Sequence, residues 1–182
     1  MSMVSTPASR ALVDVIKHIH TGELVLPEFQ RSFVWKPSEV SELFASIFEG
    51  YFIGTLLLLD KVDPAKPPFS LRLFEGVKCV NPTASLSTDG TVMVVLDGQQ
   101  RLTALYQALH VTHTSKGAML PSGISPICKT ESPYEYFLHL DELDGKNYED
   151  AVQGIHYSRK SELSAILSKV SRKEAVRMVD LF

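Results

Sequence analysis

The sequence has no apolar run long enough to cross a membrane. Its longest apolar stretch is about Ile53 to Leu59, whereas a membrane-spanning helix needs ~20 residues. Residues 1–10 also lack the basic start and apolar core of a secretory signal peptide. These absences predict a soluble, cytoplasmic protein with no membrane partner.

Cysteine is scarce, because Cys79 and Cys128 are the only two in the chain. They are far apart and have no metal or redox spacing, so we expect free thiols in a reducing compartment. The histidines show no zinc-binding spacing either. His20 and His110, on or near predicted helices, are expected to be ordinary surface residues.

A strong basic excess is also missing. The chain has 18 Lys and Arg against 21 Asp and Glu, a formal net charge of −3. A dedicated DNA-binding domain usually carries a basic stripe. The overall charge therefore does not predict a nucleic-acid-binding surface, although local basic patches stay possible.

Apolar residues make up 45% of the 182 residues, enough for the core of one domain, or of one domain with an appendage. Apolar residues at helical spacing predict helices around 12–21, 37–49, 99–109, 161–170 and 171–179. Short apolar or alternating runs predict strands around 24–26, 56–59, 71–74, 92–96 and 134–140, those at 56–59 and 92–96 being buried. Residues 60–68 and 141–145 are expected to be turns, and 114–133 a loop or insertion. Strands and helices do not alternate regularly, which predicts an α+β fold with a small mixed β-sheet packed with helices.

The most distinctive chemistry lies where the apolar run Val92–Leu96 meets Asp97-Gly98-Gln99-Gln100-Arg101. The pattern predicts a buried strand that turns directly into a helix. Backbone amides at a helix start favour an anion, and an arginine offers a planar fork for phosphate. With Asp97 to hold a metal-bound water or a ribose hydroxyl, the turn suits a nucleotide phosphate and a divalent metal. The alternative is structural, with Asp97 as a helix cap and Arg101 in a salt bridge.

A second polar pair, Gln30-Arg31, lies among Phe29, Phe33 and Trp35. We expect an extended, partly buried loop whose buried aromatic side chains hold the polar pair in a fixed place. A rigidly held arginine binds phosphate or carboxylate well. The alternative is that Arg31 stacks on Trp35 and closes the core.

Four blocks carry a family resemblance: Leu26–Trp35, Leu43–Ile47, Gly50–Thr55 and Leu96–Thr103, which contains the Asp-Gly-Gln-Gln-Arg motif. In order and spacing they resemble the amino-terminal domain of GmrSD-type modification-dependent restriction enzymes, over roughly Val13 to Leu109. The resemblance implies a nucleotide-binding fold similar to ParB and sulfiredoxin.

The resemblance also implies a site that binds a nucleoside triphosphate (GTP, UTP, CTP or ATP) with Mg²⁺ and often hydrolyses it. Carried over to this chain, the implied catalytic residues are Asp97, Gln100 and Arg101, with Asp97 as the metal ligand. The implied nucleotide-binding residues are Gln30, Arg31, Gly98, Gln99, Gln100, Arg101 and Thr103.

On this resemblance, residues 1–112 are the nucleotide-binding core, and residues 113–182 complete or extend the same domain. The apolar end of the sequence suggests a piece of a longer chain. Family members act in phage defence, where nucleotide turnover is coupled to the cleavage of modified DNA. The sequence has no nuclease motif of the His-Asn-His type, so we expect DNA to be reached through a separate nuclease domain or subunit. A homo-oligomer is also possible.

Three functions remain open at this point. The first is a nucleoside triphosphatase that regulates DNA restriction. The second is a nucleotide sensor that uses the same residues without hydrolysis. The third is a ParB-like DNA-binding or assembly module, which the acidic charge balance disfavours.

Overall fold

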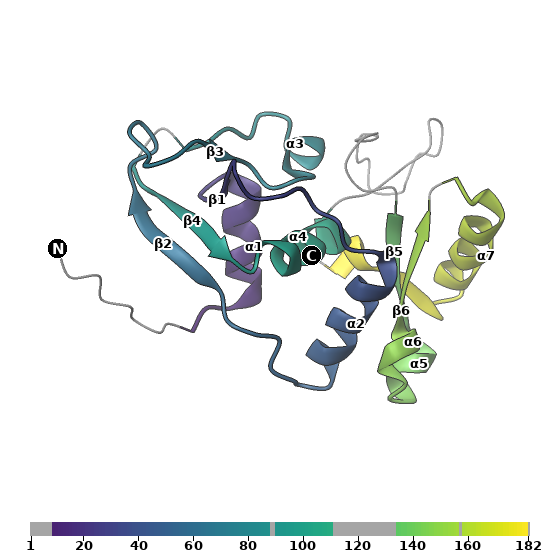
Figure 1. Cartoon of the computed structure of the whole chain (residues 1–182). Coiled ribbons are helices and arrows are strands. Elements are labelled where there is room, and N and C mark those ends of the chain that lie inside the picture. The colour runs from purple at the N-terminus through teal and green to yellow at the C-terminus, as the bar shows by residue number, and fades with distance from the viewer. Residues whose placement is uncertain (1–8, 88–89, 111–133, 157, 182) are drawn as a thin grey trace.

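The computed structural model describes residues 9–87, 90–110, 134–156 and 158–181. In this part of the chain a mixed four-stranded sheet and an antiparallel three-stranded sheet are joined by helices (Figure 1). This confirms the predicted α+β class with its mixed sheet. The expected loop 114–133 and Cys128 lie outside the described residues, as does the side chain of Cys79.

The first sheet has the order β2-β4-β1-β3. Its strands are β1 (Leu24–Pro27), β2 (Leu57–Val62), β3 (Leu71–Arg72) and β4 (Val92–Asp97). The central strands β1 and β4 run parallel, while β2 and β3 pair antiparallel at the edges. All four residues of β1 are buried, as expected for an apolar run covered on both faces.

Strand β2 departs from the prediction of a buried strand. Among the described strands it is an edge strand that pairs only with β4, and Leu57 is 54% exposed. It also continues to Val62, into the expected connector, through an irregularity where Lys61 has φ +56°. A run of leucines indicates extended backbone, but it does not reveal whether the strand lies at the edge of the sheet.

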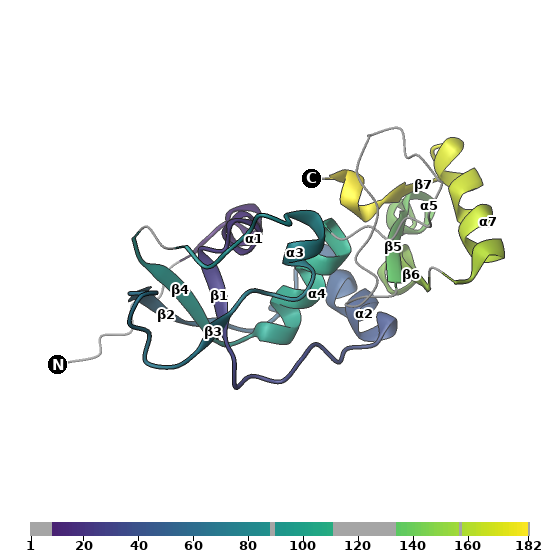
Figure 2. The ribbon, with the colours of Figure 1, turned by 90° about the horizontal axis from the view of Figure 1, so that it is seen from above.

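Three helices pack around the first sheet close to their predicted bounds: α1 (Leu12–Thr21), α2 (Pro37–Phe48) and α4 (Gln99–His110). Helix α1 ends at Gly22, whose φ of +79° suits a glycine, and its amide donates to the Ile19 carbonyl at 3.2 Å. Helix α4 is buried along most of its length because it lies between the two sheets, together with α2 (Figure 2). A short helix, α3 (Val77–Val80), follows β3 and was not predicted.

The second sheet has the order β6-β5-β7. It is made by β5 (Tyr134–His139), β6 (Val152–His156) and β7 (Ala175–Arg177). The connecting helices are α5 (Leu140–Asp144), α6 (Tyr148–Ala151) and α7 (Lys160–Ser171), and the 3₁₀ turn η1 (Met178–Leu181) follows β7. Strand β6 was not predicted, and the expected acidic turn at 141–145 is mostly the short helix α5.

The predicted last helix over 171–179 is wrong. Ser171 ends α7, Lys173 takes a left-handed φ of +62°, and Ala175–Arg177 pairs with β5. Ser171 and Glu174 have the spacing of a capping box, but pairing with a buried strand outweighs that local preference.

The main core joins residues from both halves of the chain. Phe44 of α2 and Leu105 of α4 belong to the same buried cluster as Tyr136 and Leu138 of β5. A separate cluster on the other face of β5 contains Phe137, Ile155, Ile166 and Ala175. Near it, Glu135 and Arg177 form a buried ion pair. Burial raises the pKa of the Glu135 carboxyl, and Arg177 opposes that shift.

The prediction that His20 and His110 are ordinary surface residues is wrong. Both are partly buried against Tyr106, which is fully buried. Nδ1 of His20 is hydrogen-bonded to the Tyr106 hydroxyl at 3.0 Å, and the Tyr106 and His110 rings are stacked with centroids 5.1 Å apart. The three rings fill the space where α1 meets α4.

Among the described residues, none of the helices combines the length and the apolar character that a bilayer crossing requires.

Candidate functional site

The site is organised around the turn from β4 to α4. Asp97 ends the strand, Gly98 has φ +96°, and the Leu102 amide donates to the Gly98 carbonyl at 3.0 Å. The positive φ favours glycine at this position, and a Cβ there would also lie 2.3 Å from Cδ2 of the partly exposed Leu56 side chain, which would have to move. The amides of the first α4 turn have no acceptor within the helix. They present the positive end of the helix dipole beside Asp97.

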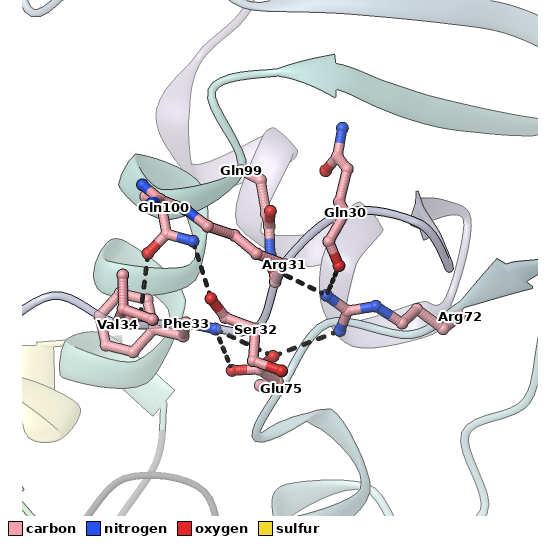
Figure 3. A network of polar contacts seen from close by, with 9 residues as sticks. All are labelled: Gln30, Arg31, Ser32, Phe33, Val34, Arg72, Glu75, Gln99 and Gln100. Atoms are coloured by element: carbon pink, nitrogen blue, oxygen red, sulfur yellow. Dashed lines mark hydrogen bonds and ion pairs between the residues drawn. The ribbon is translucent and has the colours of Figure 1, made fainter.

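The two glutamines of the turn hold the loop formed by residues 30–34 (Figure 3). Nε2 of Gln99 donates to the Arg31 carbonyl at 2.6 Å, and Nε2 of Gln100 donates to the Ser32 carbonyl at 3.1 Å. Oε1 of Gln100 in turn accepts the Val34 amide at 3.0 Å. These three hydrogen bonds join two segments that are almost seventy residues apart in the sequence. They use the side-chain amides of Gln99 and Gln100, which the sequence analysis had predicted to bind the nucleotide.

Arg72 and Glu75 support the same loop from its other side (Figure 3). The Glu75 carboxylate accepts the Phe33 amide at 2.9 and 3.1 Å. Nη2 of Arg72 donates to the carbonyls of Gln30 and Arg31, both at 3.3 Å. The expectation that aromatic residues bury and fix this loop is wrong for Phe29, which is 71% exposed. The loop is fixed mainly by polar side chains that satisfy its irregular backbone.

Gln30 itself closes the end of the first sheet. Its Nε2 donates to the carbonyls of Val95 and Leu96 at 2.9 and 3.1 Å. Its Oε1 is buried and accepts no hydrogen bond among the described residues. An acceptor in that state is costly, and a donor group on a ligand would satisfy it.

Arg101 is bound by the chain's own backbone. Nη1 donates to the Ile53 carbonyl at 2.5 Å and Nη2 donates to the Thr55 carbonyl at 2.8 Å. Nη2 also lies 3.8 Å from Oδ2 of Asp97, with the Arg101 side chain 19% exposed and the Asp97 side chain 72% exposed. The structural salt bridge that was the alternative for this pair is therefore present, and Asp97 keeps most of its carboxylate exposed.

These segments enclose a pocket of about 370 Å³, within the usual size range of small-molecule sites. The predicted site residues all line it except Thr103, which is fully buried inside α4. Trp35 and Leu96 also line it and were not predicted as site residues, although Trp35 belongs to the same aromatic segment as Arg31. The pocket is lined by Gln30, Arg31, Trp35, Leu96, Asp97, Gly98, Gln99, Gln100 and Arg101.

Arg31 and Asp97 are the charged groups that the pocket leaves most available. The Arg31 side chain is exposed, and its guanidinium has no hydrogen-bond or ion-pair partner among the described residues. No three His, Cys, Asp or Glu side chains in the described part of the chain are grouped as a metal site. A lone carboxylate suits Mg²⁺ held largely by phosphates and water. The residues present therefore fit a metal that enters with a nucleotide.

The fold and the pocket define an α+β domain with a pocket at the turn between a central strand and a buried helix. Residues 12–179 match the family described as "GmrSD restriction endonuclease, N-terminal domain". The chain belongs to this family.

A relative of this chain is the uncharacterised protein MJ0686 of Methanocaldococcus jannaschii. The two are 35% identical over 144 residues, which cover 79% of this chain. The aligned region makes up 22% of the relative, so this chain corresponds to about a fifth of that longer protein.

Proposed function

We propose that the pocket binds a nucleoside triphosphate together with Mg²⁺ and hydrolyses it, and that this controls DNA restriction by a nuclease domain or subunit. The observation that carries the proposal is the unpartnered Arg31 guanidinium beside the first turn of α4. Both features attract anions, and they meet across one pocket. A ParB/sulfiredoxin-like nucleotide fold is part of the same proposal.

The pocket offers different groups to different parts of such a ligand. The α4 amides and Arg31 would hold phosphate oxygens, and Mg²⁺, when bound, would neutralise their charge. The buried Oε1 of Gln30 would accept a donor group of the ligand. Asp97 is the one carboxylate among the described residues that line the pocket. It is therefore the residue that would help to hold Mg²⁺ and to orient an attacking water.

A second candidate is a nucleotide sensor without turnover. It is favoured by the number of polar groups that are already engaged: Gln99 and Gln100 hold the loop, and Arg101 holds two carbonyls. Transition-state stabilisation requires groups aimed at the developing charge. Arg31 and Asp97 are the main lining groups left for that task. A pocket with so few such groups suits nucleotide binding better than rapid hydrolysis.

The proposal is tested by measuring equilibrium binding and phosphate release for each of the four nucleoside triphosphates with Mg²⁺. Wild type is expected to bind at least one of them and release phosphate. Arg31→Ala should weaken binding at least about tenfold, since a charged hydrogen bond contributes ~1.5–3 kcal/mol. Asp97→Asn should bind nucleotide but release phosphate at least about a hundredfold more slowly.

Lys160→Ala is the matched control, because it removes an exposed cation at the start of the distant helix α7. Lys160→Ala should leave both nucleotide affinity and the rate of phosphate release unchanged. Nucleotide binding without phosphate release would select the sensor. Absence of binding by the wild type, or equal weakening by Arg31→Ala and Lys160→Ala, would overturn the assignment of the pocket.

A further inference from the structure

Trp35 is the one aromatic side chain among the described residues that line the pocket. It lines the pocket, and it also packs partly against the main core. It follows Arg31 by four residues, so the backbone between them spans at most roughly 14 Å. A ligand with an anionic end and a flat apolar end could therefore contact both residues at once.

We infer that the Trp35 indole is the stacking platform for the nucleobase, a role that rests on the proposed function of the pocket. Base–aromatic stacking needs a planar side chain with one accessible face held in a fixed place. Trp35 is neither buried nor fully exposed. It both packs against the core and lines the pocket.

The polar contacts of the loop explain how the indole is held in place. The Phe33 amide is bound by Glu75, and the Val34 amide is bound by Gln100, immediately before Trp35. After Trp35 the chain enters α2, where the Glu39 carboxylate accepts the Lys36 amide at 2.7 Å. The backbone is thus anchored on both sides of the tryptophan. Little ordering would be needed when a base stacks, which favours affinity.

Other exposed aromatic residues near the site suit this role less well. Phe29 makes an edge-to-face contact with Phe69, with ring centroids 5.3 Å apart. Tyr51 and Phe52 are exposed on the segment that Arg101 holds, but they do not line the pocket. Trp35 combines an aromatic surface with a place in the pocket wall.

Stacking alone gives little discrimination among bases, because every base has a π-face. The role of Trp35 therefore lies in binding nucleotides more tightly than bare polyphosphates. The substrate class is a nucleoside triphosphate whose base contributes to affinity, with choice among bases left to other contacts.

The chain contains a single tryptophan, so its intrinsic tryptophan fluorescence reports on Trp35 alone. Titration with each nucleoside triphosphate and Mg²⁺ is expected to quench or shift this emission. Inorganic tripolyphosphate with Mg²⁺ is expected to bind and leave the emission nearly unchanged. Trp35→Leu should weaken nucleotide binding about tenfold and leave tripolyphosphate binding within about twofold, with Trp35→Phe in between.

The failures of the two proposals can be told apart. If wild type binds nucleotide with unchanged emission and Trp35→Leu binds it as tightly, the stacking role is overturned and the pocket function stands. If Trp35→Leu weakens tripolyphosphate and nucleotide equally, the indole is merely structural and the inference also fails. If wild type binds neither ligand, the proposed function itself is overturned. The fluorescence titration uses wild-type protein, so it holds even if a Trp35 variant does not fold.

Discussion

The guanidinium of Arg101 lies directly against Gly54. A Cβ built on Gly54 would lie 2.2 Å from Nη1 of Arg101, and Gly54 has φ +96°. The carbonyls on either side of this glycine, those of Ile53 and Thr55, accept hydrogen bonds from the same guanidinium. Arg101 therefore fixes the segment that crosses the start of α4, and it can do so only because residue 54 has no side chain.

Gly54→Ala is expected to destabilise the fold more than an ordinary substitution at a left-handed glycine. Gly90 provides the control, because it has φ +99° and a Cβ there would meet no atom within 4 Å. Gly90→Ala should cost about 1–2 kcal/mol from backbone strain, and Gly54→Ala about 1–3 kcal/mol more from the clash. Urea unfolding measures both. In an Arg101→Ala background the additional cost should disappear, and its persistence would contradict the contact.

The two arginines of the pocket should separate stability from binding. Arg101→Ala removes two donors from backbone carbonyls and should lower the free energy of unfolding by about 2 kcal/mol. Arg31→Ala removes an exposed, unpartnered side chain and should change it by less than about 0.5 kcal/mol, while weakening nucleotide binding. Urea unfolding and nucleotide titration of both variants provide the test. A large loss of stability in Arg31→Ala would show that its main role is structural.

Glu75→Gln is expected to loosen the loop over residues 30–34. The carboxylate accepts the Phe33 amide and lies 3.4 Å from Nη1 of Arg72, in a mostly buried setting. A neutral amide weakens both interactions, so stability should fall by about 1 kcal/mol, and hydrogen exchange at the Phe33 amide should become faster. Glu162→Gln removes the exposed pair with Arg159 and should cost less than about 0.5 kcal/mol. Unchanged protection of the Phe33 amide would contradict the proposed support.

The elements most accurately predicted from the sequence were those whose pattern is dictated by burial. The amphipathic pattern of α2 and the apolar run of β4 each have one way to bury their apolar residues. The observed bounds of both elements therefore lie close to the predicted ones. The edge position of β2 and the strand β7 depend on partners distant in the sequence. Local propensity carries no information about such partners.

The predicted site residues other than Thr103 lie around one pocket, but the contacts of several of them were not foreseen. Gln99 and Gln100 were expected to face a ligand, and their side chains instead hold the loop at residues 31–34. Trp35 was predicted to hold the Gln30-Arg31 pair in place or to stack on Arg31, and not to line the pocket. Residue types predict which side chains can donate or accept hydrogen bonds. Whether the Gln99 side chain binds a ligand or the backbone depends on the fold, which brings residue 31 beside residue 99.

The stability of the protein should depend on the protonation of His110 at the end of α4. Burial, together with the nearby His20, lowers the pKa of His110 from 6.5 to about 4. The folded state therefore favours the neutral ring and binds this proton less tightly than the unfolded chain does. Above pH 6.5 the ring is neutral in both states and does not lower the free energy of unfolding. As the pH falls from 6.5 toward 4, the unfolded chain takes up the proton first, and the free energy of unfolding decreases.

His110→Gln removes this titrating group and keeps a polar side chain beside Tyr106. Urea unfolding of both proteins above pH 6.5 and near pH 4 should show that wild type loses more stability on acidification than the variant does. A direct titration of the His110 ring by NMR should give a midpoint well below 6.5. A midpoint at or above that value would mean that the ring is more hydrated than its packing against Tyr106 and His20 indicates. In that case the pH dependence of stability would have to arise from other groups, such as the buried pair of Glu135 and Arg177.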